Sequence, residues 1–232
     1  MKNASRKVAT IASLRDDSSA TQHPSKLSTF IGLAVVLGWF LPVLLHRAGR
    51  GLTTHLLTRT LLVDWLIVVI LSIIAFSIQG RKLSEFGIRA LGWRDALFAL
   101  GGLVVAFALI AVLRPTMPPQ LDFHQLNAIP VGLRIVAFVT AGICEEFVFR
   151  GFAIEELTFL TSRRWLAALL PLIVFTLLHA PLYGYSRALL VPGVLGAVLT
   201  ALYLWRHNLP SCMLMHGASD AISLLILPAL VK

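Results

Sequence analysis

Charged residues are scarce in this sequence. Asp, Glu, Lys and Arg make up 13% of its 232 residues, whereas soluble domains carry about 25%. Hydrophobic residues make up 57%, and the mean hydropathy is +0.83. This composition excludes an ordinary soluble domain and predicts a polytopic membrane protein.

Cysteines are equally few. Cys144 and Cys212 both lie inside apolar runs, so the sequence offers no disulfide framework and no sign of an oxidising compartment. Three sequence patterns are also missing: the HExxH zinc-protease motif, the GxSxG serine-hydrolase motif and a glycine-rich phosphate loop. Their absence leaves no contiguous signature of those enzyme classes.

The charges that are present are unbalanced, with 20 Lys and Arg against 11 Asp and Glu. The basic residues occur singly or in pairs between apolar runs, not in the cluster that a nucleic-acid-binding face requires. We therefore expect no nucleic-acid partner, and we interpret these residues as topology determinants that contact anionic lipid headgroups. In a seven-span arrangement thirteen of the 20 lie on the side of the N-terminus. This predicts an integral protein of a bacterial plasma membrane with a cytoplasmic N-terminus.

Apolar runs of about 20 residues can cross a hydrocarbon core as helices. Their number predicts an all-α fold, a polytopic transmembrane helical bundle of six to eight spans. Seven spans are favoured, at about 29–45, 60–79, 96–113, from 131 onward, 165–180, 188–205 and 209–229.

The chain divides into three regions. Residues 1–28 are predicted to be a disordered cytoplasmic tail, 29–130 the N-terminal transmembrane helices, and 131–229 the transmembrane helices that carry the chemistry. Between the spans, residues 80–94 form a basic loop expected at the membrane interface. The longest polar connection, 114–130, contains four prolines that interrupt any helix.

Two adjacent acids interrupt the fourth apolar run. Glu145 and Glu146 are followed by Arg150, which lies one helical turn after Glu146. An ionisable side chain inside a membrane is costly unless it is paired or solvated, so such residues are functional-site candidates. Taken alone, Glu146 and Arg150 are most simply a structural ion pair. Because Glu145 lies about 100° around the helix from Glu146, we predict that Glu145 faces a cavity.

Two further apolar spans carry polar residues at helical spacing. His179 ends the sequence FTLLH, and His216 and Asp220 share a face in HGASD. Each taken alone fits an interfacial histidine or a structural hydrogen bond. Together with Glu145 they make a hydrolytic set, because a carboxylate and imidazoles can activate water directly. Asp64, near one end of the second span, is interpreted as having no function.

A divalent metal such as zinc is the second way in which these residues can activate water. The candidate ligands are Glu145, His179, His216 and Asp220. The sequence alone leaves the metal-dependent and metal-independent mechanisms open.

In chain order, EEFVFR (Glu145–Arg150) matches EExxxR, FTLLH (Phe175–His179) matches FxxxH, and HGASD (His216–Asp220) matches HxxxN/D. This arrangement resembles the CPBP family of CAAX proteases and bacteriocin-processing enzymes, also called the Abi family, and is similar to the type II CAAX prenyl endopeptidase. The resemblance covers about residues 138–222. It implies an all-helical membrane peptidase whose site lies below the membrane surface and whose protein or peptide substrate is lipidated or membrane-associated.

The resemblance also implies roles for the first two motifs. Glu145 would be the principal base that activates water, assisted by His179. Glu146 and Arg150 would orient the first carboxylate and balance its charge. This set corresponds to either a metalloendopeptidase or a glutamate-type peptidase.

The third motif would stabilise the oxyanion through His216 and the residue at position 220. Many relatives have Asn at that position, whereas this chain has Asp220, which can only accept hydrogen bonds when it is ionised. We therefore hypothesise that Asp220 orients His216 or ligates a metal.

Two other classes of function stay open at this stage. A non-catalytic scaffold or bacteriocin self-immunity protein could keep the same fold, although the intact motifs disfavour it. An ion-coupled transporter could use the intramembrane acids and histidines as its pathway. Against the transporter, no inverted repeat broken by glycine and proline is present.

The depth of His179 conflicts with the predicted site. His179 lies late in the fifth span, so seven regular spans would place it toward the opposite membrane face from Glu145. Either the fifth span begins well outside the bilayer, or the predicted boundaries are wrong by a turn or more.

Overall fold

The computed structural model describes three stretches of the chain, residues 25–45, 53–113 and 126–230. All secondary structure within these stretches is helical, which confirms the predicted all-α class. Most of the predicted tail and most of the proline-rich connection 114–130 lie outside the described residues. Within the described residues, the helix nearest the N-terminus begins at Lys26, inside the predicted tail.

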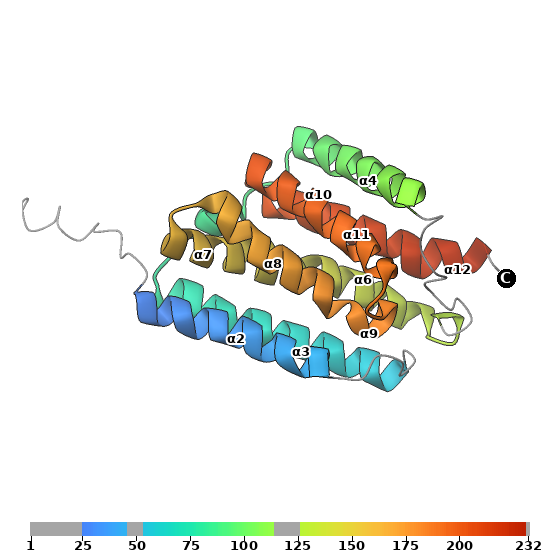
Figure 1. The fold of residues 1–232 in the computed structure, drawn as a ribbon, viewed down its shortest axis with the longest axis horizontal. Helices are drawn as coiled ribbons and strands as arrows, with labels where there is room; N and C mark the ends of the chain where they lie inside the picture. Colours follow the sequence, from blue (N-terminus) through green and yellow to red (C-terminus); the bar gives the residue numbers. More distant parts are fainter. Residues whose placement is uncertain (1–24, 46–52, 114–125, 231–232) are drawn as a thin grey trace, which may run out of the picture.

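The helices pack side by side as an elongated bundle (Figure 1). In chain order they are α2 (Lys26–Leu45), α3 (Thr54–Ser72), α4 (Trp93–Leu113), α6 (Val131–Glu146), α7 (Ile154–Thr161), α8 (Arg164–Leu178), α9 (Ala180–Tyr183), α10 (Leu190–Arg206), α11 (Leu209–Ala221) and α12 (Leu227–Leu230). Short 3-10 helices precede α4 and α10, namely η3 (Leu83–Phe86) and η6 (Arg187–Leu189).

Wider π-helical turns extend three of these rods within the described residues. They are η2 (Ile73–Ile78), which continues α3, η5 (Phe147–Ala153), which joins α6 to α7, and η7 (Ile222–Ile226), which joins α11 to α12. Such turns occur frequently at functional sites. The segment η5 begins directly after Glu146 and contains Arg150, so the predicted Glu–Glu–Arg motif straddles the change from α to π geometry.

The outer surface of the bundle fits a lipid environment. Large apolar side chains face outward, for example Leu62, Val104 and Val112. Four helical rods in the described part are long and apolar enough to cross a membrane, at Thr54–Ile78, Trp93–Leu113, Arg187–Arg206 and Leu209–Leu230. Shorter apolar helices cover Lys26–Gly38 and Arg164–Leu178. The chain is therefore an integral membrane protein, and the count of seven spans stays a prediction.

The predicted span boundaries lie close to the observed helix ends. The largest difference is at the second span, which begins at Thr54 instead of near residue 60. Thr53 explains the earlier start, because its hydroxyl accepts a hydrogen bond from the backbone N–H of Leu56 at 3.2 Å and caps the helix. Hydropathy alone does not register such a polar cap.

The loop between η2 and α4 is folded into one end of the bundle. Phe86 is fully buried, and its ring stacks on Phe152 with the centroids 6.2 Å apart. Gly87 has φ +70 and lies so close to Tyr203 that an added Cβ would come within 2.8 Å of the ring. The carbonyl of Gly87 also accepts the backbone N–H of Leu209 at 2.7 Å. The loop thereby fixes the start of α11.

Two helix pairings position the residues of interest. The helices α3 and α6 run parallel, because Trp65 meets Thr140 near the middle and Phe76 meets Phe147 further along both helices. In contrast, α11 runs antiparallel to α6, and α4 covers α10 and α11 on the far side (Figure 1). The rod that contains α6, η5 and α7 therefore lies between α3 and α11.

Candidate active site

Glu146 is the centre of a buried polar cluster. Its side chain is 0% exposed, and its Oε1 accepts hydrogen bonds from Arg150 Nη1 at 2.8 Å and from His216 Nδ1 at 2.7 Å. Arg150 also donates to the carbonyl of Gly196 at 3.2 Å. The prediction that Glu146 pairs with Arg150 agrees with this geometry, and the contact adds His216 from a helix seventy residues away in sequence.

Close helix crossings make this cluster possible. A Cβ added at Gly142 would come within 3.0 Å of the backbone nitrogen of Gly217 and 3.1 Å of the carbonyl of Met213. The backbones of α6 and α11 therefore touch one turn before Glu146, where only glycine fits. This approach brings His216 within hydrogen-bonding distance of Glu146.

Phe175 joins the second motif to the other two. Its ring is fully buried, and the guanidinium carbon of Arg150 lies 4.3 Å above it. The ring centroids of His179 and His216 lie 4.9 Å and 5.8 Å from that of Phe175. One aromatic side chain therefore contacts residues of all three motifs.

His179 lies at the end of α8 and is half-buried. Its Nδ1 lies 2.8 Å from the carbonyl of Phe175. Because a carbonyl can only accept, Nδ1 carries the hydrogen, and Nε2 is the acceptor in the neutral ring.

The expected separation in depth between His179 and the glutamates is not present. The rod from Val131 to Thr161 is longer than the roughly 20 residues that cross a hydrocarbon core. The ring of Phe175 lies 4.9 Å from that of His179 and 4.3 Å from the guanidinium carbon of Arg150, so His179 lies beside the Glu146–Arg150 pair. A fifth span that begins outside the bilayer stays a prediction.

Glu145 differs from its neighbour in having no hydrogen-bond partner among the described residues. Its side chain is only partly buried, whereas that of Glu146 is fully enclosed. The charged groups that act on it electrostatically are His216, Asp64, Asp220 and Glu146. Glu145 is therefore the acid whose oxygens are available to a water molecule or a substrate.

Asp220 contacts the other side of His216. Its Oδ2 lies 3.6 Å from His216 Nε2, and its side chain is 26% exposed. His216 therefore has a carboxylate next to each ring nitrogen, with Glu146 the closer of the two. This geometry is compatible with the hypothesis that Asp220 orients His216.

The predicted metal ligands do not converge on one point. Among the described residues, no group of three or more His, Cys, Asp or Glu side chains is arranged to hold a metal ion. His216 is occupied by Glu146, and His179 Nδ1 by a backbone carbonyl. The side chains as arranged do not fit a metal ion, and a metal requirement stays an untested prediction.

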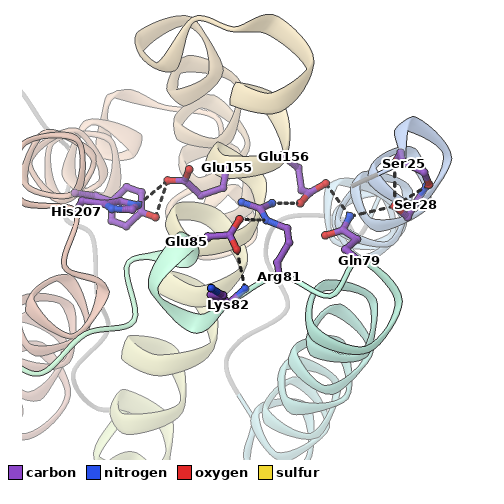
Figure 2. Close-up of polar contacts among 10 residues, drawn as sticks. Ser25, Ser28, Gln79, Arg81, Lys82, Glu85, Glu155, Glu156 and His207 are labelled. Carbon is purple, nitrogen blue, oxygen red and sulfur yellow. Dashed lines mark hydrogen bonds and ion pairs between the residues drawn. The ribbon is translucent and has the colours of Figure 1, made fainter. Parts of the chain in front are cut away.

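Sequence reasoning missed two features near this site. Asp64 on α3 lies in the electrostatic neighbourhood of Glu145, although it was interpreted as having no function. A second pair of acids, Glu155 and Glu156 on α7, forms a polar network at one end of the bundle (Figure 2). The partners of both come from segments distant in sequence, and helical spacing cannot reveal them.

Comparison with known proteins supports the three-motif resemblance. Residues 127–222 match the family model described as type II CAAX prenyl endopeptidase Rce1-like. No curated protein and no solved structure matches the chain. The matched segment contains the Glu145–Arg150, Phe175–His179 and His216–Asp220 motifs and excludes α2, α3 and α4. The resemblance is thereby confirmed: residues 127–222 carry the signature of the Rce1-like family of membrane proteases.

Proposed function

We propose that the protein is an intramembrane endopeptidase that hydrolyses a peptide bond of a membrane-associated or lipidated protein or peptide. The observation that carries the proposal is the difference between the two adjacent glutamates. Glu146 is held by Arg150 and His216, whereas Glu145 beside it has no hydrogen-bond partner among the described residues. An acid kept partner-free inside an apolar bundle is suited to act on water or substrate.

In the proposed first step, Glu145 takes a proton from water, and the water oxygen attacks the carbonyl carbon of the peptide bond. His179 Nε2 accepts a hydrogen bond from the other O–H of that water and orients it, since the Nδ1 hydrogen is donated to the Phe175 carbonyl. Glu145 thus acts as the general base, which contributes about 10²–10⁴-fold to a rate.

In the second step, the tetrahedral intermediate collapses. His216 donates Nδ1–H to Glu146 and, with both ring nitrogens protonated, stabilises the oxyanion through Nε2–H. Glu145 then delivers its proton to the amide nitrogen, the C–N bond breaks, and a carboxylic acid and an amine are released. Arg150 holds Glu146 in place throughout by its hydrogen bond to Oε1.

The resting arrangement favours a metal-independent version of this reaction. Glu146 and His216 satisfy each other directly, and the described side chains do not form a ligand set. The proposal therefore derives no step through a metal. If activity in purified protein persists with a strong chelator present and without bound zinc, this version is supported.

The test compares the peptide termini in membranes of cells that express the wild type, Glu145→Gln or Glu155→Gln. We expect a set of termini that is present with the wild type and with Glu155→Gln, and absent with Glu145→Gln at equal expression. Glu155 is the matched control, because it is an acid on the same rod that is fully engaged in hydrogen bonds. Identical termini in all three samples would rule out the proposed hydrolysis.

An ion-coupled transporter is the second candidate, and one observation favours it. Two acids on other helices, Asp64 on α3 and Asp220 on α11, interact electrostatically with Glu145 on α6. A proton pathway requires such a set of neighbouring titratable side chains. Proteoliposomes distinguish the two functions: a transporter acidifies or accumulates solute across the bilayer, whereas a peptidase releases peptide fragments without doing so. The scaffold alternative predicts neither effect.

A further inference from the structure

Asp64 is a buried acid in an apolar span. It lies on α3, in the helical segment Thr54–Ile78 that is long and apolar enough to cross a membrane. Only 5% of the surface of Asp64 is exposed. Its Oδ1 is buried and has no hydrogen-bond partner among the described residues. A buried polar atom without a protein partner in a native structure commonly marks a bound water or a functional site.

The position of Asp64 next to the candidate site follows from the parallel packing of α3 on α6. The indole N–H of Trp65 donates to the hydroxyl of Thr140 at 3.2 Å and fixes the register of the two helices. Asp64 acts electrostatically on Cys144 and on Glu145, which lie about one turn beyond Thr140. Asp64 therefore lies at the boundary between α3 and the helix of the proposed base.

Two other buried acids, Glu146 and Glu156, are each paired with a cation. Glu146 and Glu156 are both 0% exposed, and each binds an arginine, at 2.8 Å and 2.6 Å respectively. Asp64 has no such cation. Since burial of an unpaired carboxyl opposes folding, packing alone would favour an apolar side chain at this position.

We propose that Asp64 is a positioning residue of the active site, and that its unpartnered oxygen holds a water molecule between α3 and α6 beside Glu145. This inference rests on the proposed function, because the water it holds is the one that Glu145 activates or the one that replaces it after each turnover. A second buried oxygen without a partner among the described residues, Glu146 Oε2, belongs to the residue next to Glu145 and provides a further acceptor for water. Residue 64 lies outside the matched segment 127–222, so the N-terminal helices contribute directly to the site.

The test uses the full-length protein in detergent and in proteoliposomes, with the variants Asp64→Leu and Asp64→Asn. The probe is a synthetic peptide that spans a cleavage site found by comparing wild-type and Glu145→Gln membranes. The matched control is Glu156→Leu, which removes a buried acid that is paired with Arg81. Thermal unfolding is measured for all variants, and it needs no substrate.

We expect Asp64→Leu to unfold at the same temperature as the wild type or higher, because an unpaired buried carboxyl is replaced by an apolar side chain. Its kcat should fall by about tenfold or more, the effect of losing one hydrogen bond that orders the reacting water, while KM stays unchanged. Asp64→Asn should lose less, because its amide oxygen still accepts a hydrogen bond from water. Glu156→Leu should show the reverse pattern, a lower unfolding temperature with unchanged kcat per folded molecule.

Three results would overturn the inference. If Asp64→Leu unfolds at a lower temperature, as Glu156→Leu does, Asp64 is a structural residue. If Glu145→Gln is inactive while Asp64→Leu keeps the wild-type kcat, the proposed function stands and Asp64 has no part in it. If Glu145→Gln itself keeps full activity, the proposed function fails and the inference fails with it.

Discussion

The rod from α6 to α7 carries two Glu–Glu pairs, and their surroundings are opposite. Glu155 and Glu156 lie near the end of the bundle and are surrounded by donors (Figure 2). Glu156 Oε1 accepts from Arg81 at 2.6 Å and Oε2 from Gln79 at 3.1 Å. Neither acid of this pair has a buried oxygen without a partner.

The Glu155 carboxylate also accepts three hydrogen bonds, all at Oε1. It accepts from the hydroxyl of Tyr203 at 2.8 Å, from Arg164 at 2.9 Å and from His207 Nε2 at 3.2 Å. Arg89 donates to Nδ1 of that histidine at 3.2 Å, so Nδ1 must be unprotonated and Nε2 carries the hydrogen toward Glu155. Both acids of this pair are therefore held by hydrogen bonds from other segments at the end of the bundle.

The Glu145–Glu146 pair differs from the other pair in its hydrogen bonding. Glu146 Oε2 is buried without a partner, and Glu145 makes no hydrogen bond to the described residues. The same dipeptide on the same rod is thus structural in one place and suited to chemistry in the other. The difference lies in how many donors the neighbouring helices provide, and the following changes test that difference.

The largest effect is expected for Glu145→Gln against Glu155→Gln. Loss of the base should reduce kcat by about 10²–10⁴-fold with little change in stability, because Glu145 has no hydrogen-bond partner to lose in the described part of the chain. Glu155→Gln should leave kcat within a few fold. The two rates are measured on the same peptide in proteoliposomes, and equal rates would remove the distinction between the pairs.

Next in size is the loss of stability when Glu156 is replaced by Leu. The change leaves Arg81, whose side chain is 8% exposed, with only the more exposed Glu85 as its ion-pair partner, and should cost about 3 kcal/mol. Adding Arg81→Met should recover most of this loss, since the buried charge that has lost its enclosed partner is then gone. Denaturant unfolding in detergent measures both variants, and a double variant no more stable than the single one would contradict the ion-pair account.

A smaller effect is expected at the helix crossing that assembles the first pair. In Gly142→Ala the new methyl would meet backbone atoms of α11 at 3.0–3.1 Å, so α6 and α11 must move apart, at a cost of about 1–3 kcal/mol. Activity should fall because His216 is displaced from Glu146. Gly132→Ala on the same helix is the control: nothing lies within 4 Å of its Cβ, so it should keep activity and gain about 0.5–1 kcal/mol. Equal behaviour of the two variants would show that the crossing is not tight.

Part of the fold and of the site could be predicted from the sequence, for a physical reason. Hydropathy and helical spacing predicted the spans and the pairing of Glu146 with Arg150, because both depend on local geometry along one helix. The contacts of Glu146 with His216, of Glu155 with Tyr203 and of Asp64 with the site join distant segments, and no local pattern encodes them. The burial of Asp64 was not predicted for that reason, since it depends on the packing of α3 against a helix distant in sequence.

The smallest effect is expected for Asp220→Asn, and it sharpens the comparison within the site. Asp220 lies 3.6 Å from His216, whereas Glu146 lies 2.7 Å from it, so Glu146 is the principal partner of that imidazole. The amide oxygen of Asn can take the place of the carboxylate oxygen near His216 Nε2, and kcat/KM should change by only about threefold, roughly 0.6 kcal/mol. Glu146→Gln, measured beside it, should lose far more, because it also leaves Arg150 unpaired. A loss in Asp220→Asn that matches that of Glu146→Gln would show that the carboxylate itself is required. Recovery of that activity by added zinc would then identify Asp220 as a metal ligand rather than a residue that orients His216.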